Sequence, residues 1–177
     1  MKSIWRFILT ILLCQSLLGC DALYRILDKK GAEEKDLVGG AVPFEKNLRV
    51  EEIQNLLKIY GYNPGSIDGV LGLKTRNAIE RFQKDTGLAP SRFVDKETWH
   101  KLTAFKEKGL VVGRDLNVKL VQQILEVAGF SPGTRDGQWG DKTQDAVKAF
   151  QKAHHLKADG KIGYATLTKM AEYISRE

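Results

Sequence analysis

The sequence predicts an all-α fold in which two tandem, small three-helix domains follow a signal peptide and a flexible tether. Three observations lead to this prediction: an internal duplication, apolar residues at helical spacing in both copies, and poor strand signals along the chain. Shifting the sequence by 68 residues aligns Leu48–Leu102 with Leu116–Met170 without a gap, and 19 of the 55 positions are identical. This period is longer than that of solenoid repeats, so each copy is expected to be one small domain.

Each copy is expected to contain three helices. The first is predicted by apolar residues at helical spacing behind a polar capping residue: Val50, Ile53, Leu57 and Tyr60 behind Asn47, and Val118, Val121, Leu125 and Ala128 behind Asp115. The second shows the i, i+3, i+4, i+7 pattern of a buried face: Thr75, Ala78, Ile79 and Phe82, then Thr143, Ala146, Val147 and Phe150. The third is shorter and begins near Asp95 and near Gly163. The domains should span 47–108 and 109–177, with residues 103–115 as a short linker between the copies.

The first and second helices of each copy are joined by a glycine-rich loop, GYNPGSIDGVLGLKT at 61–75 and GFSPGTRDGQWGDKT at 129–143. Gly61 and Gly129 suit a left-handed helix C-cap. The Pro-Gly and Asp-Gly pairs predict tight turns, in which the side chains of Asp68 and Asp136 accept a backbone N–H two residues on. A catalytic role for these two carboxylates is the alternative, but each fits the turn within its own repeat. Four glutamines shared by the copies either brace the loop by hydrogen bonds or line a groove: Gln54, Gln122, Gln83 and Gln151.

The first 19 residues, MKSIWRFILTILLCQSLLG, are expected to be an export signal. Lys2 and Arg6 give a positive start, and the apolar run that follows is too short for an ordinary spanning helix of about 20 residues. Residues 20–46 contain the charged stretch DKKGAEEKD and the flexible stretch GGAVP, so they are expected to be a tether. Loss of Lys2 and Arg6 with the signal lowers the formal net charge from +6 to +4.

The stretch Leu17-Leu18-Gly19-Cys20 resembles the lipobox of bacterial lipoproteins. In that family the signal is cut before the cysteine, and the cysteine thiol is acylated. The resemblance implies that Cys20 anchors the chain to a membrane of the bacterial cell envelope, facing the periplasm or the outer surface. Asp21 resembles the inner-membrane retention signal of enterobacterial lipoproteins and favours the inner membrane. Cleavage would also remove Cys14, so no disulfide is expected.

The two copies resemble the peptidoglycan-binding-like domain family. Its pattern, V-x-x-[IL]-Q-x-x-L followed by G-Y-x-P-G-x-x-D-G-x-x-G-x-x-T-x-x-A-[IV]-x-x-F-Q, is found in VEEIQNLL…GYNPGSIDGVLGLKTRNAIERFQ and again in VKLVQQIL…GFSPGTRDGQWGDKTQDAVKAFQ. The first copy departs from the family at Ser91-Arg92, where Asp-Gly is usual, and at Leu71, where an aromatic residue is common. The second departs at His155, where glycine is usual. The resemblance implies that peptidoglycan is the partner.

Free carboxylates of peptidoglycan stem peptides suit a basic site at a helix N-terminus. Lys74 and Lys142 are expected in the first turn of the second helix, directly after the glycine loop, with Tyr62 or Phe130 supplying apolar contact. The alternative is that both lysines are solvated surface residues with no part in binding. The full set of expected ligand contacts is Tyr62, Asp68, Lys74, Thr75, Arg76, Phe130, Arg135, Asp136, Trp139, Lys142 and Thr143.

The sequence offers little for catalysis. Neither the tether nor the linker has room for a catalytic domain, and His100, His154 and His155 lack metal-ligand spacing. The chain is therefore expected to be a non-catalytic binding protein with no cofactor, and export argues against a nucleic-acid partner. The alternative from another class is an envelope adaptor that binds a protein or recruits a cell-wall enzyme. An enzyme with an unrecognised site is the least favoured hypothesis.

Overall fold

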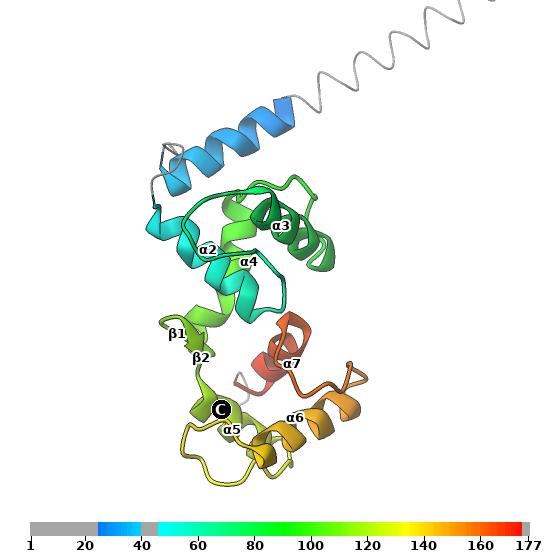
Figure 1. Ribbon diagram of the computed structural model, residues 1–177. Helices are drawn as coiled ribbons and strands as arrows, with labels where there is room; N and C mark the ends of the chain where they lie inside the picture. The colour runs from blue at the N-terminus through cyan, green and yellow to red at the C-terminus, as the bar shows by residue number, and fades with distance from the viewer. Residues whose placement is uncertain (1–24, 40–45, 175–177) are drawn as a thin grey trace, which may run out of the picture.

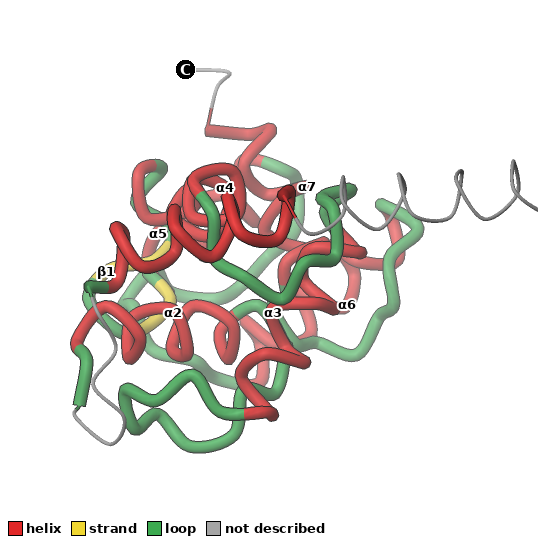
Figure 2. The backbone as a smooth tube through the Cα atoms, turned by 90° about the horizontal axis from the view of Figure 1, so that it is seen from above, coloured by secondary structure: helices red, strands yellow, loops and turns green. Residues whose placement is uncertain are grey.

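The computed structural model describes residues 25–39 and 46–174. The first repeat contains α2 (Leu48–Ile59), α3 (Leu73–Asp85) and α4 (Lys96–Glu107), and the second contains α5 (Val118–Val127), α6 (Asp141–Ala153) and α7 (Tyr164–Ile174). A short hairpin of β1 (Val111–Val112) and β2 (Asp115–Leu116) connects them. The expected all-α fold with two tandem three-helix domains is confirmed (Figures 1 and 2).

Side-chain caps fix the start of three helices. Asn47 accepts hydrogen bonds from the backbone nitrogens of Arg49 and Val50 at the start of α2, as predicted. Asp95 caps α4 by accepting from the backbone nitrogen of Thr98. The expected cap at Asp115 is wrong, because Asn117 caps α5 and Asp115 lies in β2. Polar residues at both positions could serve as caps, and periodicity does not separate them.

The connection between the repeats is an ordered hairpin, so the predicted short linker over 103–115 is wrong in its details. Helix α4 continues to Glu107, and β1 then pairs antiparallel with β2 in the register Val111 with Leu116 and Val112 with Asp115. The turn docks on α2, where an Arg114 nitrogen lies 3.0 Å from an oxygen of the buried Glu51. These contacts fix the direction in which the chain leaves the first repeat.

Residues 25–38 form a helix, and the prediction of a flexible tether is wrong for this part of the segment (Figure 1). The helix docks on the first repeat through the Glu34 carboxylate, which lies 2.7 Å from Nη1 of Arg76 and accepts the backbone N–H of Val94 at 2.7 Å. Lys30 forms an ion pair with Asp95. Some of the charged residues on which the tether prediction rested are thus docking contacts.

The two repeats pack against each other through the start of α7. The ring of Tyr164 lies 5.6 Å from that of Tyr60, 5.2 Å from Phe82 and 5.2 Å from Phe105, measured between centroids. Three of these four residues belong to the first repeat. Each repeat also has its own buried centre, with Phe82 in one and Phe150 in the other, both fully buried. The repeats therefore form one packed body with two centres.

No described helix has the length and apolar character needed to cross a membrane. The predicted signal, Cys20 and Asp21 lie outside the described residues.

Candidate functional site

In each repeat, a buried glutamine side chain holds the glycine-rich loop in place through hydrogen bonds. In the first repeat, Nε2 of Gln54 donates to Asp68 Oδ1 at 2.8 Å and to the carbonyl of Val70 at 3.0 Å. Its Oε1 accepts the backbone N–H groups of Asp68 and Gly69, both at 3.0 Å. Gln122 repeats most of this arrangement, accepting from Gly137 at 2.9 Å and donating to Asp136, Gln138 and Thr143. Of the two roles left open by the sequence, the structure therefore shows bracing for both glutamines.

Asp68 and Asp136 complete these turns, as predicted. Asp68 Oδ1 accepts the backbone N–H of Val70 at 3.0 Å, and Asp136 Oδ1 accepts that of Gln138 at 2.8 Å. The hydrogen bond from Gln54, followed by that from Val70, holds the pKa of the Asp68 carboxyl below its ordinary value. For Asp136 the amide of Gln138 comes first and the side chain of Gln122 second. Both carboxylates stabilise the loop in their ionised form.

Thr75 and Thr143 also belong to this framework. Both are buried, and their hydroxyls donate to the carbonyls of Pro64 at 3.0 Å and Pro132 at 3.1 Å. The expectation that they contact ligand is therefore wrong, because their side chains are enclosed between the loop and the helix. They instead tie the Pro-Gly turn to the first turn of α3 or α6.

Lys74 and Lys142 are exposed at matching positions in the first turns of α3 and α6. Their stems cover the Pro-Gly turns, since a Cβ placed on Gly65 would lie 3.1 Å from Lys74 Cδ and one on Gly133 would lie 3.2 Å from Lys142 Cδ. The helices begin at Gly72 and Gly140, which provide no side-chain cap. Each lysine thus lies over the loop at an uncapped helix N-terminus, which attracts negative charge. Helix α6 also carries Asp141 in its first turn, whereas α3 has no acidic residue there.

The two expected arginine contacts are already paired within the protein. Arg76 binds the carboxylate of Glu34 and donates to the carbonyl of Arg92. Arg135 lies 3.1 Å from Glu126. A ligand carboxylate would have to compete with these partners. The Arg135 pair is exposed and therefore weak, whereas Arg76 is held by the buried Glu34.

The three aromatic residues expected to contact ligand differ in how far they are exposed. Tyr62 and Phe130 are half-buried and pack edge-on against Phe82 and Phe150, at centroid distances of 5.6 and 5.7 Å. The Tyr62 hydroxyl donates to Asp85 at 3.0 Å, and burial, followed by this carboxylate, raises the pKa of the tyrosine. Trp139 is 41% exposed, so its ring is partly open to a ligand.

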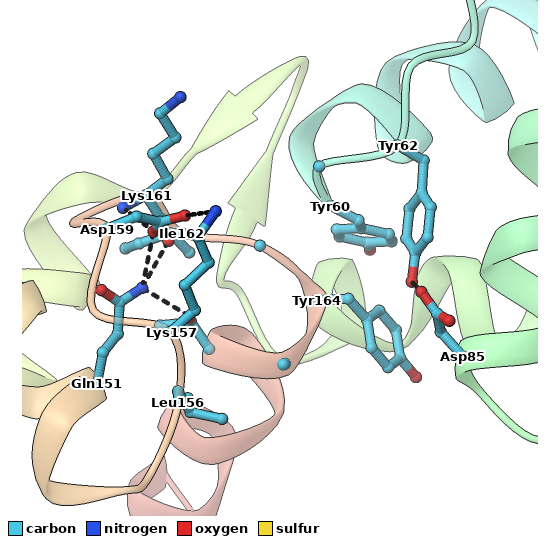
Figure 3. Close-up of a pocket in the computed structure, with 14 residues that line it drawn as sticks. Tyr60, Tyr62, Asp85, Gln151, Leu156, Lys157, Asp159, Lys161, Ile162 and Tyr164 are labelled. Carbon is cyan, nitrogen blue, oxygen red and sulfur yellow. Dashed lines mark hydrogen bonds and ion pairs between the residues drawn. The ribbon is translucent and has the colours of Figure 1, made fainter.

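A pocket of about 380 Å³ lies between the two repeats, and of its lining residues the sequence analysis had singled out Tyr62 and Gln151 (Figure 3). Tyr60, Tyr62 and Asp85 line it from the first repeat. The second repeat contributes Gln151 and most residues between Leu156 and Thr166, with the ring of Tyr164 beside that of Tyr60. Its volume falls within the range typical of small-molecule sites. No spacing within one repeat could have predicted the pocket, because both repeats are needed to form it.

The described residues contain no cluster of three or more histidine, cysteine, aspartate or glutamate side chains placed to hold a metal ion.

Comparison with known families identifies the family of the two repeats. The family described as "Putative peptidoglycan binding domain" matches residues 46–102 and again residues 114–170. The chain belongs to this family. Both matches contain the first two helices and the braced loop of a repeat, and each ends within the third helix, at Leu102 of α4 and Met170 of α7.

Curated relatives carry similar segments in longer proteins. The chain is 33% identical over 127 residues to "Uncharacterized protein YbfG" of Bacillus subtilis, covering 64% of this chain and 17% of that protein. It is 35% identical over 68 residues to "Localization factor PodJL" of Caulobacter vibrioides, covering 38% of this chain and 7% of that protein. It is 30% identical over 139 residues to "N-acetylmuramoyl-L-alanine amidase CwlL" of Bacillus licheniformis, covering 74% of this chain and 37% of the amidase. No solved structure matches significantly.

Two departures from the family pattern fall at left-handed backbone positions. Arg92 has φ 67° where Gly160 of the other repeat has 71°, and His155 has φ 54° where Gly87 has 72°. Because side chains other than glycine rarely adopt this conformation, these positions carry local strain. The backbone shape is retained all the same, so the two repeats share one conformation at these positions.

Proposed function

We propose that this protein is a non-catalytic, lipid-anchored envelope protein that binds the stem peptides of peptidoglycan through its two repeats. Family membership supports peptidoglycan as the partner. Anchoring rests on the Leu-Leu-Gly-Cys stretch that ends at Cys20. Because export and peptidoglycan binding point to the same compartment, the cell envelope is its site of action, and Asp21 favours the inner membrane.

The observation that carries the proposal is the matched placement of Lys74 and Lys142. In both repeats the lysine lies over the Pro-Gly turn, beside an uncapped helix N-terminus and a loop that its glutamine holds rigid. A stem-peptide carboxylate placed there would receive backbone N–H donors and a full positive charge. Asp141 weakens the electrostatic attraction in the second repeat, so the first repeat should bind more tightly.

The test is a sedimentation assay with purified sacculi and the full chain in detergent micelles. Lys74→Glu combined with Lys142→Glu should reduce sacculus binding at least tenfold, while the circular dichroism spectrum and melting temperature stay close to those of the wild type. Added salt should weaken wild-type binding, because exposed charges are screened. The sacculi should release no soluble fragments, and their release would contradict the non-catalytic assignment.

A charge-matched control separates a local effect from a general one. Lys58→Glu with Lys152→Glu reverses the same number of exposed charges, one in each repeat, at the far ends of α2 and α6. This control should retain most of the binding. Equal loss in both double variants would mean that net charge, rather than the loop site, determines binding. Full binding by the Lys74 and Lys142 variant would place the ligand elsewhere.

The similarity to a localization factor favours a second candidate, an envelope adaptor that binds a protein partner. Under this alternative the protein should not sediment with sacculi, and crosslinking in intact cells should recover a defined envelope protein. Sedimentation of the purified chain with sacculi in the absence of any other protein would contradict it.

The anchor has its own test. Cys20→Ala should abolish incorporation of a labelled fatty acid and leave the chain uncut or free of acyl groups. Cys14→Ala is the matched control, since Cys14 lies within the predicted signal, and it should leave labelling unchanged. Continued acylation of the Cys20 variant would overturn the anchor assignment.

A further inference from the structure

The pocket between the repeats has an apolar lining with polar groups at both sides. Tyr60, Tyr62 and Tyr164 contribute rings, and Leu156 and Ile162 contribute aliphatic side chains. Tyr164 is half-buried, and burial raises the pKa of its hydroxyl. Such a lining can hold a short, partly apolar chain, and the polar groups then determine which chain fits.

Opposite charges occupy the two sides of the pocket in Figure 3. Asp85 lies on the first-repeat side and accepts the Tyr62 hydroxyl. Lys157 and Lys161 lie on the second-repeat side, both exposed, with Asp159 between them. Lys157 lies 3.5 Å from Asp159, whose other oxygen accepts the backbone N–H of Lys161 at 2.9 Å. The second-repeat side therefore carries one more positive charge than negative, and the first-repeat side carries one negative charge.

The internal duplication shows what the second-repeat side is shaped to bind. Ile162 aligns with Val94 of the first repeat, where the backbone N–H donates to the Glu34 carboxylate at 2.7 Å. That carboxylate is only 5% exposed, so the first repeat holds a carboxylate in an enclosed position. Lys96, two residues further on, donates its backbone N–H to Glu33 at 3.4 Å.

In the second repeat no acidic side chain takes the place of Glu34. The equivalent of Lys96 is Tyr164, whose N–H donates instead to the carbonyl of Tyr60. The Ile162 N–H has no hydrogen-bond partner among the described residues, and Ile162 lines the pocket. The N–H that binds a carboxylate of the chain in the first repeat thus has no such partner in the second, at a residue that lines the pocket.

We propose that the pocket between the repeats binds a short peptide that carries a free carboxylate and a free amine. The carboxylate accepts the Ile162 N–H beside Lys157 and Lys161, and the amine pairs with Asp85. Peptidoglycan stem peptides contain both groups on a short chain with small apolar side chains. The inference rests on the proposed function, but it names a site separate from Lys74 and Lys142.

A titration followed by nuclear magnetic resonance tests the proposal directly. The probe is a stem tetrapeptide with free carboxylates and a free side-chain amine, added to the full chain, labelled with nitrogen-15, in detergent micelles. The amide signals of Ile162, Gly163 and Tyr164 should shift with one saturation curve, whereas that of Val94 should not, because Glu34 occupies it. Shifts confined to the amides near Lys74 and Lys142 would overturn the pocket while leaving peptidoglycan binding intact.

Chemically blocked probes and charge variants test the two sides separately. Amidation of the peptide carboxylates and Lys157→Glu with Lys161→Glu should each weaken binding at least tenfold. Acetylation of the amine and Asp85→Asn should weaken it about threefold to tenfold. Lys108→Glu with Lys152→Glu, at exposed positions that do not line the pocket, is the matched control and should bind like the wild type. Equal affinity for the free and the amidated peptide would refute the carboxylate site.

The sacculus assay keeps this inference distinct from the proposed function. If the wild type sediments with sacculi but the tetrapeptide leaves the pocket amides unmoved, the pocket assignment fails and the function stands. If neither sacculi nor tetrapeptide binds, both fail. Binding of the tetrapeptide at Ile162 with normal sedimentation of the Lys157 and Lys161 variant would assign the pocket to soluble peptide rather than to the intact wall, which supports the site.

Discussion

The backbone N–H of Tyr164 donates to the carbonyl oxygen of Tyr60 at 3.1 Å, and the two rings meet edge to face with centroids 5.6 Å apart. Tyr60 is the C-cap of α2 in the first repeat, and Tyr164 is the first residue of α7 in the second. A helix end from one repeat thus binds a helix start from the other. The last turn of α2 leaves carbonyl groups without intrahelical partners, and the first turn of α7 leaves N–H groups without them, so the contact satisfies both.

Tyr164→Ala should therefore weaken the packing between the repeats. The substitution removes three ring contacts but keeps the backbone hydrogen bond. Since the ring is only half-buried, we expect the free energy of unfolding to fall by about 2 kcal/mol, below the range for fully buried aromatic residues. Urea denaturation measures this change, and small-angle X-ray scattering should show a larger radius of gyration. Val112→Ala, at an exposed position in β1, should change stability by less than about 0.5 kcal/mol. An unchanged midpoint for Tyr164→Ala would contradict the packing argument.

The second prediction concerns how much the loop-bracing glutamines contribute to stability. Gln54→Leu leaves the backbone N–H groups of Asp68 and Gly69 without their acceptor, and we expect a loss of about 2–4 kcal/mol in the free energy of unfolding. Gln122→Leu should cost less, because its side chain accepts only the Gly137 N–H. The measurement is urea denaturation of both variants. Gln123→Leu, at a partly exposed neighbour, is the control and should stay near wild type. A greater loss of unfolding free energy in Gln122→Leu than in Gln54→Leu would contradict this comparison of hydrogen bonds.

The turn carboxylates predict a loss of stability in acid. Hydrogen bonds hold the pKa values of Asp68 and Asp136 below the ordinary value of about 3.9. The unfolded chain therefore binds more protons than the folded chain once the pH falls below about 4. The contribution of these carboxylates is fully present above that pH and is lost as the pH falls through the lowered pKa values. Urea midpoints between pH 6 and pH 2 measure the effect.

Asp68→Asn with Asp136→Asn isolates these two groups from the other carboxylates with lowered pKa values, such as Asp95 and Asp159. The double variant should be less stable than the wild type at pH 6, and the difference should shrink below pH 4. Asp145→Asn, an exposed position on α6, is the matched control. A difference that stays constant down to pH 2 would rule out the proposed linkage.

Local sequence patterns correctly predicted the turns and the buried helix faces within each repeat. Gly61 and Gly129 adopt the expected positive φ values, 91° and 86°, because the chain must reverse after each first helix. The buried stripes of α3 and α6 follow the sequence period, so Phe82 and Phe150 lie at the centre of their repeats as the spacing indicated. These features depend on residues within a few positions of one another, which a single sequence displays directly.

The features that the sequence did not predict depend on contacts between distant segments. The helix at 25–38 is docked by Glu34 on Arg76 and Val94, 42 and 60 residues away. The pocket needs Tyr62 and Asp85 from one repeat and Lys161 from the other. Periodicity marks a buried face but does not name its partner, so neither the pairing of Arg76 nor the pocket could be read from local patterns.

A reciprocal exchange at the end of the second helices tests how much strain the departures from the family pattern impose. His155 and Gly87 occupy equivalent positions with φ 54° and 72°, and each N–H donates to the carbonyl three residues before it, on Lys152 or Lys84. A Cβ at Gly87 would meet no atom within 4 Å, so Gly87→His changes backbone strain without a clash. We expect Gly87→His to lower the melting temperature by about 2–4 °C and His155→Gly to raise it by a similar amount, which corresponds to about 1 kcal/mol each. The chain carrying both substitutions should melt near the wild type, because the sites lie in different repeats and their effects should add. Thermal unfolding followed by circular dichroism decides the matter, and a destabilised His155→Gly variant would mean that the histidine side chain contributes contacts that outweigh the strain of its backbone.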